Sequence, residues 1–242
     1  MAPSSLEHDH SPESIRARLA APPRPSYVRD WVYGGIDGAV TTFAIVAGVV
    51  GANLSSGIIL ILGAANLLAD GFSMAAGNYS GTKTEVDDYR RLREIERRHI
   101  AVAPEGEREE IRQILAAKGL DGAALEEAVA AITADEERWI DTMLAEEYGV
   151  SQTVRSPLAA ALSTFAAFFV CGAVPLLPFV LNLPHAFPIA IVMTGLVFFF
   201  IGSGKARWSL APWWASGLET LTIGAVAAGA AYVIGDLLKG LA

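Results

Sequence analysis

Two long stretches without a charged residue constrain this chain more than any other feature. Residues 38–69 give 32 consecutive uncharged positions, and residues 156–204 give 49. A membrane-spanning helix needs about 20 consecutive apolar residues, so each stretch has room for more than one span. Backbone groups in lipid must form their hydrogen bonds within the segment, which makes these spans helical. The chain is therefore expected to be an all-α membrane protein.

Turn-forming residues divide these stretches into separate spans. The first stretch breaks at Asn53-Leu-Ser-Ser-Gly57 and the second near Asn182-Leu-Pro-His185, because Asn, Ser, Gly and Pro favour turns. A fifth apolar run follows near the C-terminus. The five predicted transmembrane helices are residues 32–51, 58–79, 157–181, 187–204 and 213–237.

The charges gather in one insert between the second and third spans. Residues 81–155 hold 18 acidic and 11 basic residues. Helical spacing, with Pro104 at a start and glycines at the ends, predicts three helices there, over 80–101, 105–118 and 122–148. The predicted parts of the chain are a polar N-terminal tail (1–28), spans one and two (29–80), a helical metal-binding insert (81–155) and spans three to five (156–242).

The positive charges predict the topology. Lys and Arg occur in the tail, in the insert and in the link after span four, whereas the links at 52–57 and 182–186 have none. The positive-inside rule then places the N-terminus and the insert in the cytosol. The expected location is a bacterial plasma membrane or a vacuole-like membrane, with the protein integral and multi-pass.

Composition also excludes several functions. A net charge of −8 argues against nucleic acid as a partner, and the single cysteine, Cys171, cannot form a disulfide framework. Phosphate loops, nucleophile elbows and thiol–zinc motifs do not occur in the sequence, so we expect no organic cofactor and no ordinary soluble enzyme. His8 and His10 in the tail are expected to be solvated.

Polar side chains inside the spans are the first functional candidates. A charge at the bilayer centre costs about 2.5–3.5 kcal/mol on insertion scales, so Asp37 and Asp70 are candidates for a transport path. Met74 follows Asp70 by one turn on the same helix face and offers a soft thioether, which suits transition metals better than Mg²⁺ or Ca²⁺. Glu219 is expected near the interface. For Asp37 the alternative is a capping role near the interface, and for Met74 it is packing.

Three pairs of potential metal ligands, one on each predicted insert helix, are the second group. Solvated acidic helices would explain any single pair, but three such pairs in one membrane protein favour a metal site. The pairs are Glu96 with His99, Glu107 with Glu110, and Met143 with Glu147.

Several motifs resemble one known family. Residues 31–43 (WVYGGIDGAVTTF) and 70–77 (DGFSMAAG) are similar to the first and second spans of the vacuolar iron transporter family. Residues 141–147 resemble the end of its cytosolic metal-binding domain. The third, fourth and fifth spans are matched by Ser156-Pro-Leu with Val174-Pro-Leu-Leu-Pro178, by Gly204-Lys-Ala-Arg207 and by residues 216–224, so the similarity runs in order from about residue 29 to 238.

The resemblance implies a homodimer of five spans per chain that moves Fe²⁺, and often Mn²⁺, out of the cytosol in exchange for protons. Asp37 and Met74 match positions that line the translocation path. The positions that match the cytosolic metal-binding domain are Glu96, Glu107, Glu110, Met143 and Glu147.

Three positions depart from the family pattern. His99 stands where a Glu is usual, and an imidazole still binds Fe²⁺ while favouring Zn²⁺ more than a carboxylate does. Leu144 stands where many members have a second Met. Asn78, the fourth residue expected along the transport path, stands where Glu is usual and cannot carry a proton. Asp37, Asp70 and Glu219 are therefore the carboxylates left for proton coupling.

Two other classes stay open at this point. The sequence Glu96-x-x-His99 suggests a di-iron ferroxidase-like enzyme, although such sites normally combine two Glu-x-x-His pairs with two further Glu. A membrane metal sensor that binds metal without transporting it is the second alternative.

Overall fold

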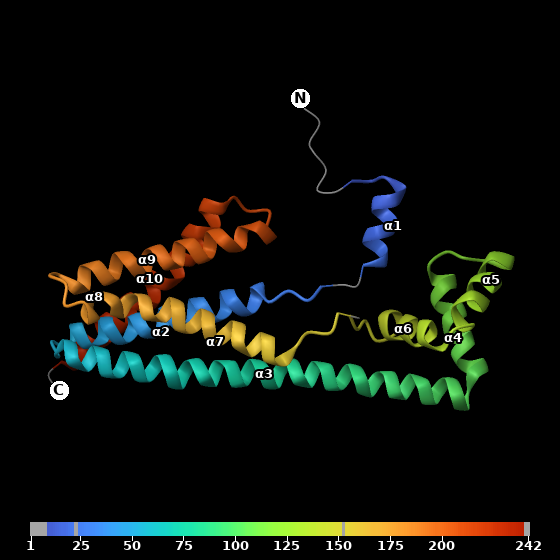
Figure 1. Ribbon diagram of the computed structural model, residues 1–242, viewed down its shortest axis with the longest axis horizontal. Helices are drawn as coiled ribbons and strands as arrows, with labels where there is room; N and C mark the ends of the chain where they lie inside the picture. Colours follow the sequence, from blue (N-terminus) through green and yellow to red (C-terminus); the bar gives the residue numbers. More distant parts are fainter. Residues whose placement is uncertain (1–8, 22–23, 152, 240–242) are drawn as a thin grey trace, which may run out of the picture. The chain divides into compact units, whose positions relative to one another are not determined.

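The computed structural model describes residues 9–21, 24–151 and 153–239. These residues form helices joined by short connections, without a strand among them (Figure 1). The prediction of an all-α protein is confirmed for this part of the chain.

The chain divides into two compact units. We call Ser26–Val86 with Arg155–Ala242 the span unit, and Met1–Pro25 with Asp87–Val154 the acidic unit. Helix α3 (Ser56–Val102) contributes to both.

Five helical segments of the described residues are long and apolar enough to cross a membrane, as predicted. Their breaks fall where the sequence placed them, because Asn53 and Asn182 adopt left-handed φ angles of 57° and 49°, which Asn tolerates better than most residues. The segments are α2 (Val28–Gly51), the first part of α3, Pro157–Val180, α9 (Ala186–Lys205), which η2 (Ala206–Trp208) prolongs, and α10 (Trp213–Leu238).

The third span is less regular than predicted. It begins at α7 (Pro157–Ala173), where the Ser156 hydroxyl accepts a hydrogen bond from the Ala159 amide at 3.3 Å. It then tightens into η1 (Val174–Leu176) and ends as α8 (Leu177–Val180). Pro175 and Pro178 explain the change, since proline has no amide hydrogen for the helical ladder.

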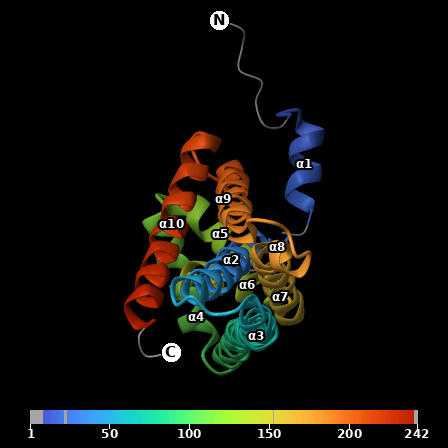
Figure 2. The ribbon, with the colours of Figure 1, turned by 90° about the vertical axis from the view of Figure 1, so that its left-hand side faces the viewer.

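Helix α2 packs against α7, α9 and α10, and Figure 2 shows it in the middle of these helices. Two glycines allow its close approach to α7. A Cβ atom on Gly34 would lie 2.3 Å from the Thr164 carbonyl oxygen, and one on Gly38 would lie 2.2 Å from that of Phe168. Small residues at such spacing let membrane helices meet along their backbones.

The insert between the second and third spans holds one helix more than predicted. Helix α3 continues from the second span to Val102, and α4 (Pro104–Ala117) ends before Gly119, both as expected. The single helix expected over 122–148 is wrong: the chain forms α5 (Gly122–Thr133) and α6 (Glu136–Glu146). The physical reason is Asp135, whose carboxylate accepts a hydrogen bond from the Arg138 amide at 2.8 Å and so starts a new helix.

The N-terminal tail contains a helix that the sequence analysis did not predict. Helix α1 (Pro12–Ala20) starts at Ser11, whose side chain accepts from the Ser14 amide, with proline in the first helical position. His10 lies just before this helix, and His8 lies outside the described residues.

Candidate metal sites

Three potential metal ligands meet in the acidic unit. Glu96 and His99 come from α3 and Glu107 comes from the first turn of α4, and one ligand atom from each lies within 4.8 Å of the other two. The Nδ1 atom of His99 is 3.4 Å from Glu107 Oε1 and 3.8 Å from Glu96 Oε1. The sequence placed these residues in two separate pairs, and the fold joins them.

Both carboxylates of this group are buried without full compensation. Glu96 is 0% exposed and Glu107 is 5% exposed. Glu96 Oε1 accepts a hydrogen bond from the Tyr148 hydroxyl at 2.9 Å. The second oxygen of each carboxylate is buried with no hydrogen-bond partner. A buried carboxylate oxygen without a partner is costly, and a bound cation would remove that cost.

Burial and mutual repulsion raise the proton affinity of the carboxylates around this group. Burial, followed by repulsion from Glu110, Glu96 and Glu147, raises the pKa of Glu107 to about 7. Burial, then Glu96 and Glu110, also raises the pKa of Glu147. Burial and the hydrogen bond to Glu96 raise the pKa of Tyr148, which keeps this hydroxyl a donor. Four predicted carboxylate ligands therefore share one electrostatic cluster with His99.

Met143 has a different environment from the other predicted ligands. Its side chain is fully buried and packs with Ile111, Val129 and Trp139. This position accounts for Met143 as a core residue, and its role as a metal ligand stays a prediction. Leu144, the position where many family members have Met, packs with Leu92 and Ile140 in a second apolar cluster.

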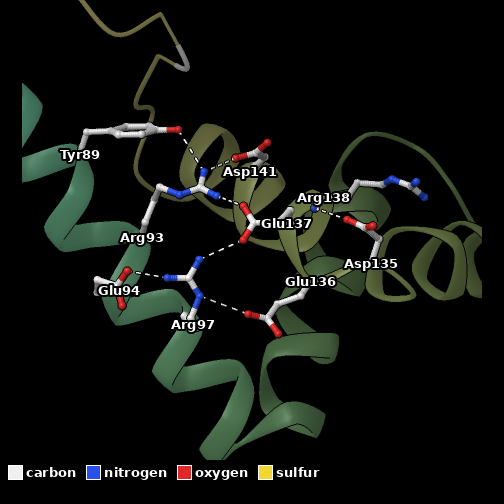
Figure 3. A network of polar contacts seen from close by, with 9 residues as sticks. All are labelled: Tyr89, Arg93, Glu94, Arg97, Asp135, Glu136, Glu137, Arg138 and Asp141. Atoms are coloured by element: carbon white, nitrogen blue, oxygen red, sulfur yellow. Dashed lines mark hydrogen bonds and ion pairs between the residues drawn. The ribbon is translucent and has the colours of Figure 1, made fainter.

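A network of ion pairs neutralises a different set of acids in the same unit (Figure 3). Arg97 binds Glu136 at 3.2 Å and Glu137 at 2.9 Å. One turn earlier on α3, Arg93 binds Glu137 and Asp141. These contacts tie α6 to α3. The sequence analysis missed this network, although the spacing of the two arginines by four residues on one helix was a signal for it.

The network leaves the metal-ligand candidates without basic partners. In the described part of the chain, no ion pair joins Glu96, Glu107, Glu110 or Glu147 to a Lys or Arg; the contacts of Glu96 and Glu107 are with His99. The acidic unit therefore separates structural carboxylates, which are paired with arginine, from a cluster of carboxylates without a Lys or Arg partner among the described residues.

A second candidate site lies in the span unit. A cavity of about 490 Å³ opens between α2 and α3, and Asp70, Met74 and Asn78 line it at intervals of one turn on a single face of α3. Asp30 and Arg155 complete its polar wall. The structure thus brings together three of the four predicted path residues.

Asn78 is held firmly in this cavity. Its amide nitrogen lies within hydrogen-bond distance of Thr164 Oγ1 (2.7 Å), Asp30 Oδ1 (2.9 Å) and the Ala160 carbonyl (3.1 Å). Thr82 donates to the amide oxygen at 3.4 Å. A side chain with this many contacts fixes the distance between α2, α3 and α7.

Asp30 is a functional candidate that the sequence analysis missed. It is 3% exposed, forms an ion pair with Arg155, and accepts the hydrogen bond from Asn78. Arg155 also lies over the Tyr27 ring, 5.4 Å from its centroid. Asp30 and Arg155 are 125 residues apart, so nothing in the local sequence indicates their pairing.

The remaining carboxylates of the spans have separate positions. Asp37 is partly buried on α2, outside the lining of the cavity, and it interacts electrostatically with Asp70. Glu219 is exposed on α10 and binds Lys205 at 3.0 Å. The expectation that Glu219 lies near the membrane interface stays a prediction.

Five candidate spans and an uncompensated acidic cluster define the class of this protein: it is a multi-pass helical membrane protein with a candidate cation site. A model of the VIT family matches residues 28–236, and the chain belongs to this family. Family membership makes it a transporter and not an enzyme, so the ferroxidase-like alternative is not supported.

Its relatives include proteins named vacuolar iron transporter. One from Arabidopsis thaliana, vacuolar iron transporter 1, is 33% identical over 88% of this chain and 86% of its own length. One from Tulipa gesneriana with the same name is 34% identical over 88% of this chain and 87% of its own length. A vacuolar iron transporter from Toxoplasma gondii is 32% identical over 88% of this chain and 74% of its own length.

Proposed function

We propose that this protein exports Fe²⁺, and also Mn²⁺, from the cytosol in exchange for protons, as a means of storing or detoxifying iron. The observation that carries this proposal is the buried group of Glu96, His99 and Glu107, in which two carboxylate oxygens have no partner. Carboxylate and imidazole ligands suit Fe²⁺ and Mn²⁺. The names of the relatives support iron as the substrate.

The acidic unit is proposed to lie in the cytosol and to capture the ion. The basic residues of the tail, the insert and the link after α9 support this topology through the positive-inside rule. Glu110 and Glu147 add to the negative potential around Glu107, which raises the local cation concentration. Met143 is proposed as a soft ligand at the edge of the apolar core.

The path through the membrane is proposed to use Asp37, Asp70 and Met74. Asp70 and Met74 line one cavity on α3, and Asp37 is close enough to interact with Asp70. Asn78 lies in the same cavity but cannot exchange a proton. Proton coupling is therefore proposed to use Asp37 and Asp70, and a proton from the far side would displace the metal from these two carboxylates.

A homodimer is part of the proposal. Large apolar side chains on α3 are exposed in the single chain, among them Ile61 (71%), Leu68 (60%) and Phe72 (69%). Gly77 and Gly81 on the same helix have open space where a Cβ would lie. Exposed apolar surface beside small residues suits the close approach of a second copy.

Metal flux into proteoliposomes tests this function. The purified protein is reconstituted with an internal metal-sensitive dye and an imposed pH gradient, and Fe²⁺, Mn²⁺, Zn²⁺ and Mg²⁺ are compared. Uptake of Fe²⁺ and Mn²⁺ that depends on the gradient, without Mg²⁺ uptake, is the expected result. Metal flux that does not depend on the pH gradient would contradict proton exchange. Metal binding without flux would favour a metal sensor.

Asp37→Ala tests the path assignment in the same assay. We expect flux to be abolished while the protein keeps its size on gel filtration, because the variant removes a carboxylate from the path without touching the acidic unit. Thr222→Ala, which removes an exposed hydroxyl of α10 outside the cavity, is the control and should keep most of the flux. Full activity of Asp37→Ala would overturn the path.

A further inference from the structure

Two adjoining cavities lie at the end of the span unit where α2 begins and α9 ends. The larger, about 500 Å³, and the smaller, about 310 Å³, share Val28, Val32, Lys205 and Trp208 in their walls. The smaller shares no lining residue with the cavity that holds Met74 and Asn78, whereas the larger shares Arg29 and Tyr33 with it. Most of their lining is apolar, with Ile36 in one and Phe200 and Ile201 in the other.

Three cationic side chains line these apolar cavities. Arg29 lines the larger, Arg207 lines the smaller, and Lys205 lines both. Arg29 and Arg207 are exposed and form no ion pair or hydrogen bond in the described part of the chain. Lys205 binds Glu219 at 3.0 Å, which leaves further N–H donors of its ammonium group available. Glu219 is the acidic partner of Lys205, and Arg29 also lines the cavity whose wall contains Asp30, Asp70 and Glu85.

Exposed aromatic rings border the same cavities. Trp208 is 65% exposed, Tyr33 is 64% exposed and Trp31 is 43% exposed. Trp and Tyr collect at the depth of lipid headgroups, because their rings are apolar with one polar atom. Arg29 and Lys205 occupy the ends of two candidate spans, which puts the cations at that same depth.

We propose that these two cavities form a binding site for an anionic phospholipid. The phosphate would lie among Arg29, Lys205 and Arg207, and an acyl chain would follow the apolar wall past Val32. Basic pockets between membrane helices recognise anionic headgroups in this way. A second copy of the chain fits less well, because an apolar helix face packed here would leave these cations buried without an anionic partner.

Lipid retention by the intact protein tests the proposal. The delipidated full-length protein in detergent is mixed with phosphatidylglycerol or phosphatidylcholine of identical acyl chains, and bound lipids are counted by native mass spectrometry. We expect a preference for phosphatidylglycerol that falls about tenfold in Arg29→Gln/Arg207→Gln. Arg90→Gln/Arg91→Gln, which removes two exposed cations of the acidic unit, should keep the preference.

Two further arms separate the remaining explanations. Glycerol phosphate, which has no acyl chain, should compete weakly; strong competition would mean an anion site without lipid and would overturn the proposal. Brominated phosphatidylglycerol should quench tryptophan fluorescence more than brominated phosphatidylcholine, and Trp208→Phe should reduce the excess. An unchanged lipid preference in the double arginine variant would overturn the proposal. It would also be overturned if this variant changed the ratio of monomer to dimer without changing lipid binding.

Discussion

The span unit and the acidic unit each bury carboxylates, but they differ in whether those carboxylates have polar partners. In the span unit, Asp30 is 3% exposed and is compensated by Arg155 and Asn78. In the acidic unit, Glu96 and Glu107 are equally buried, yet each keeps one oxygen without a partner. Burial alone therefore does not distinguish the candidate metal site from a structural carboxylate; the missing compensation does.

Removing the partner of Asp30 should have the largest effect on stability. Arg155→Met leaves a buried carboxylate without its cation, and breaking a buried ion pair in this way costs about 3–5 kcal/mol. Reversible unfolding in mixed micelles measures the loss. Asp30→Asn/Arg155→Met, which removes both charges, should recover most of it. A loss below about 1 kcal/mol in the single variant would show that Asp30 does not depend on Arg155.

The corresponding change in the acidic unit should spare stability and remove metal binding. Glu96→Gln/Glu107→Gln takes away two ligands, and even changes to groups that only orient ligands cost roughly 10–100-fold in metal affinity. The variant also relieves repulsion between buried carboxylates, so the metal-free protein should unfold no more easily. Isothermal titration calorimetry with Mn²⁺ measures the metal affinity.

A matched control for this variant is Glu109→Gln/Glu126→Gln. These exposed carboxylates belong to the same unit and bind Arg112, so the change in charge is equal while the metal group is untouched. Mn²⁺ affinity should stay within about threefold of the unchanged protein. An equal loss in both double variants would mean that general charge, and not the buried group, holds the metal.

The raised pKa of Glu107 predicts opposite pH dependences for stability and metal binding. Because the folded protein holds this pKa at about 7 and the ordinary value is 4.5, the folded state binds the proton more tightly than the unfolded state. The metal-free protein should therefore gain about 1 kcal/mol as the pH falls from 7.5 to 6. Mn²⁺ affinity should fall over the same range, since the metal competes with that proton. Glu107→Gln should lose the gain in stability.

The arginine network should give the smallest effect. Arg97→Gln removes exposed ion pairs to Glu136 and Glu137, and such pairs contribute little in water. The melting temperature should move by about 2 °C or less, with Mn²⁺ affinity nearly unchanged. A large loss of affinity would show that the position of α6, which this network fixes, controls the metal group.

The sequence was most informative where one property extends over many residues. The charge-free stretches predicted four of the five spans, and a separate apolar run predicted the fifth. Asn53 and Asn182 predicted the turns, because their left-handed conformation is a local preference. The break between α5 and α6 was not predictable in the same way. Asp135 stands among other acidic residues, and only its hydrogen bond to the Arg138 amide distinguishes it.

Pairings between distant residues were beyond the sequence. The ligand spacing and the family resemblance identified Glu96, His99 and Glu107, but the tertiary fold is needed to bring α4 against α3. Asp30 sits next to Arg29 in the sequence, yet its partner is Arg155. The sequence shows that Asn78 lacks a carboxyl group that could carry a proton. Its contacts with Asp30 and Thr164 form only when three helices pack together.

The dependence of Fe²⁺ flux on Fe²⁺ concentration tests the central claim most directly. Initial rates are measured in proteoliposomes for the unchanged protein, Glu96→Gln/Glu107→Gln and Asp37→Ala. If the acidic unit captures the ion and the spans carry it, the double variant should need at least about tenfold more Fe²⁺ for half-maximal flux and keep its maximal rate. Asp37→Ala should lose the maximal rate. Identical curves for the double variant and the unchanged protein would contradict the account.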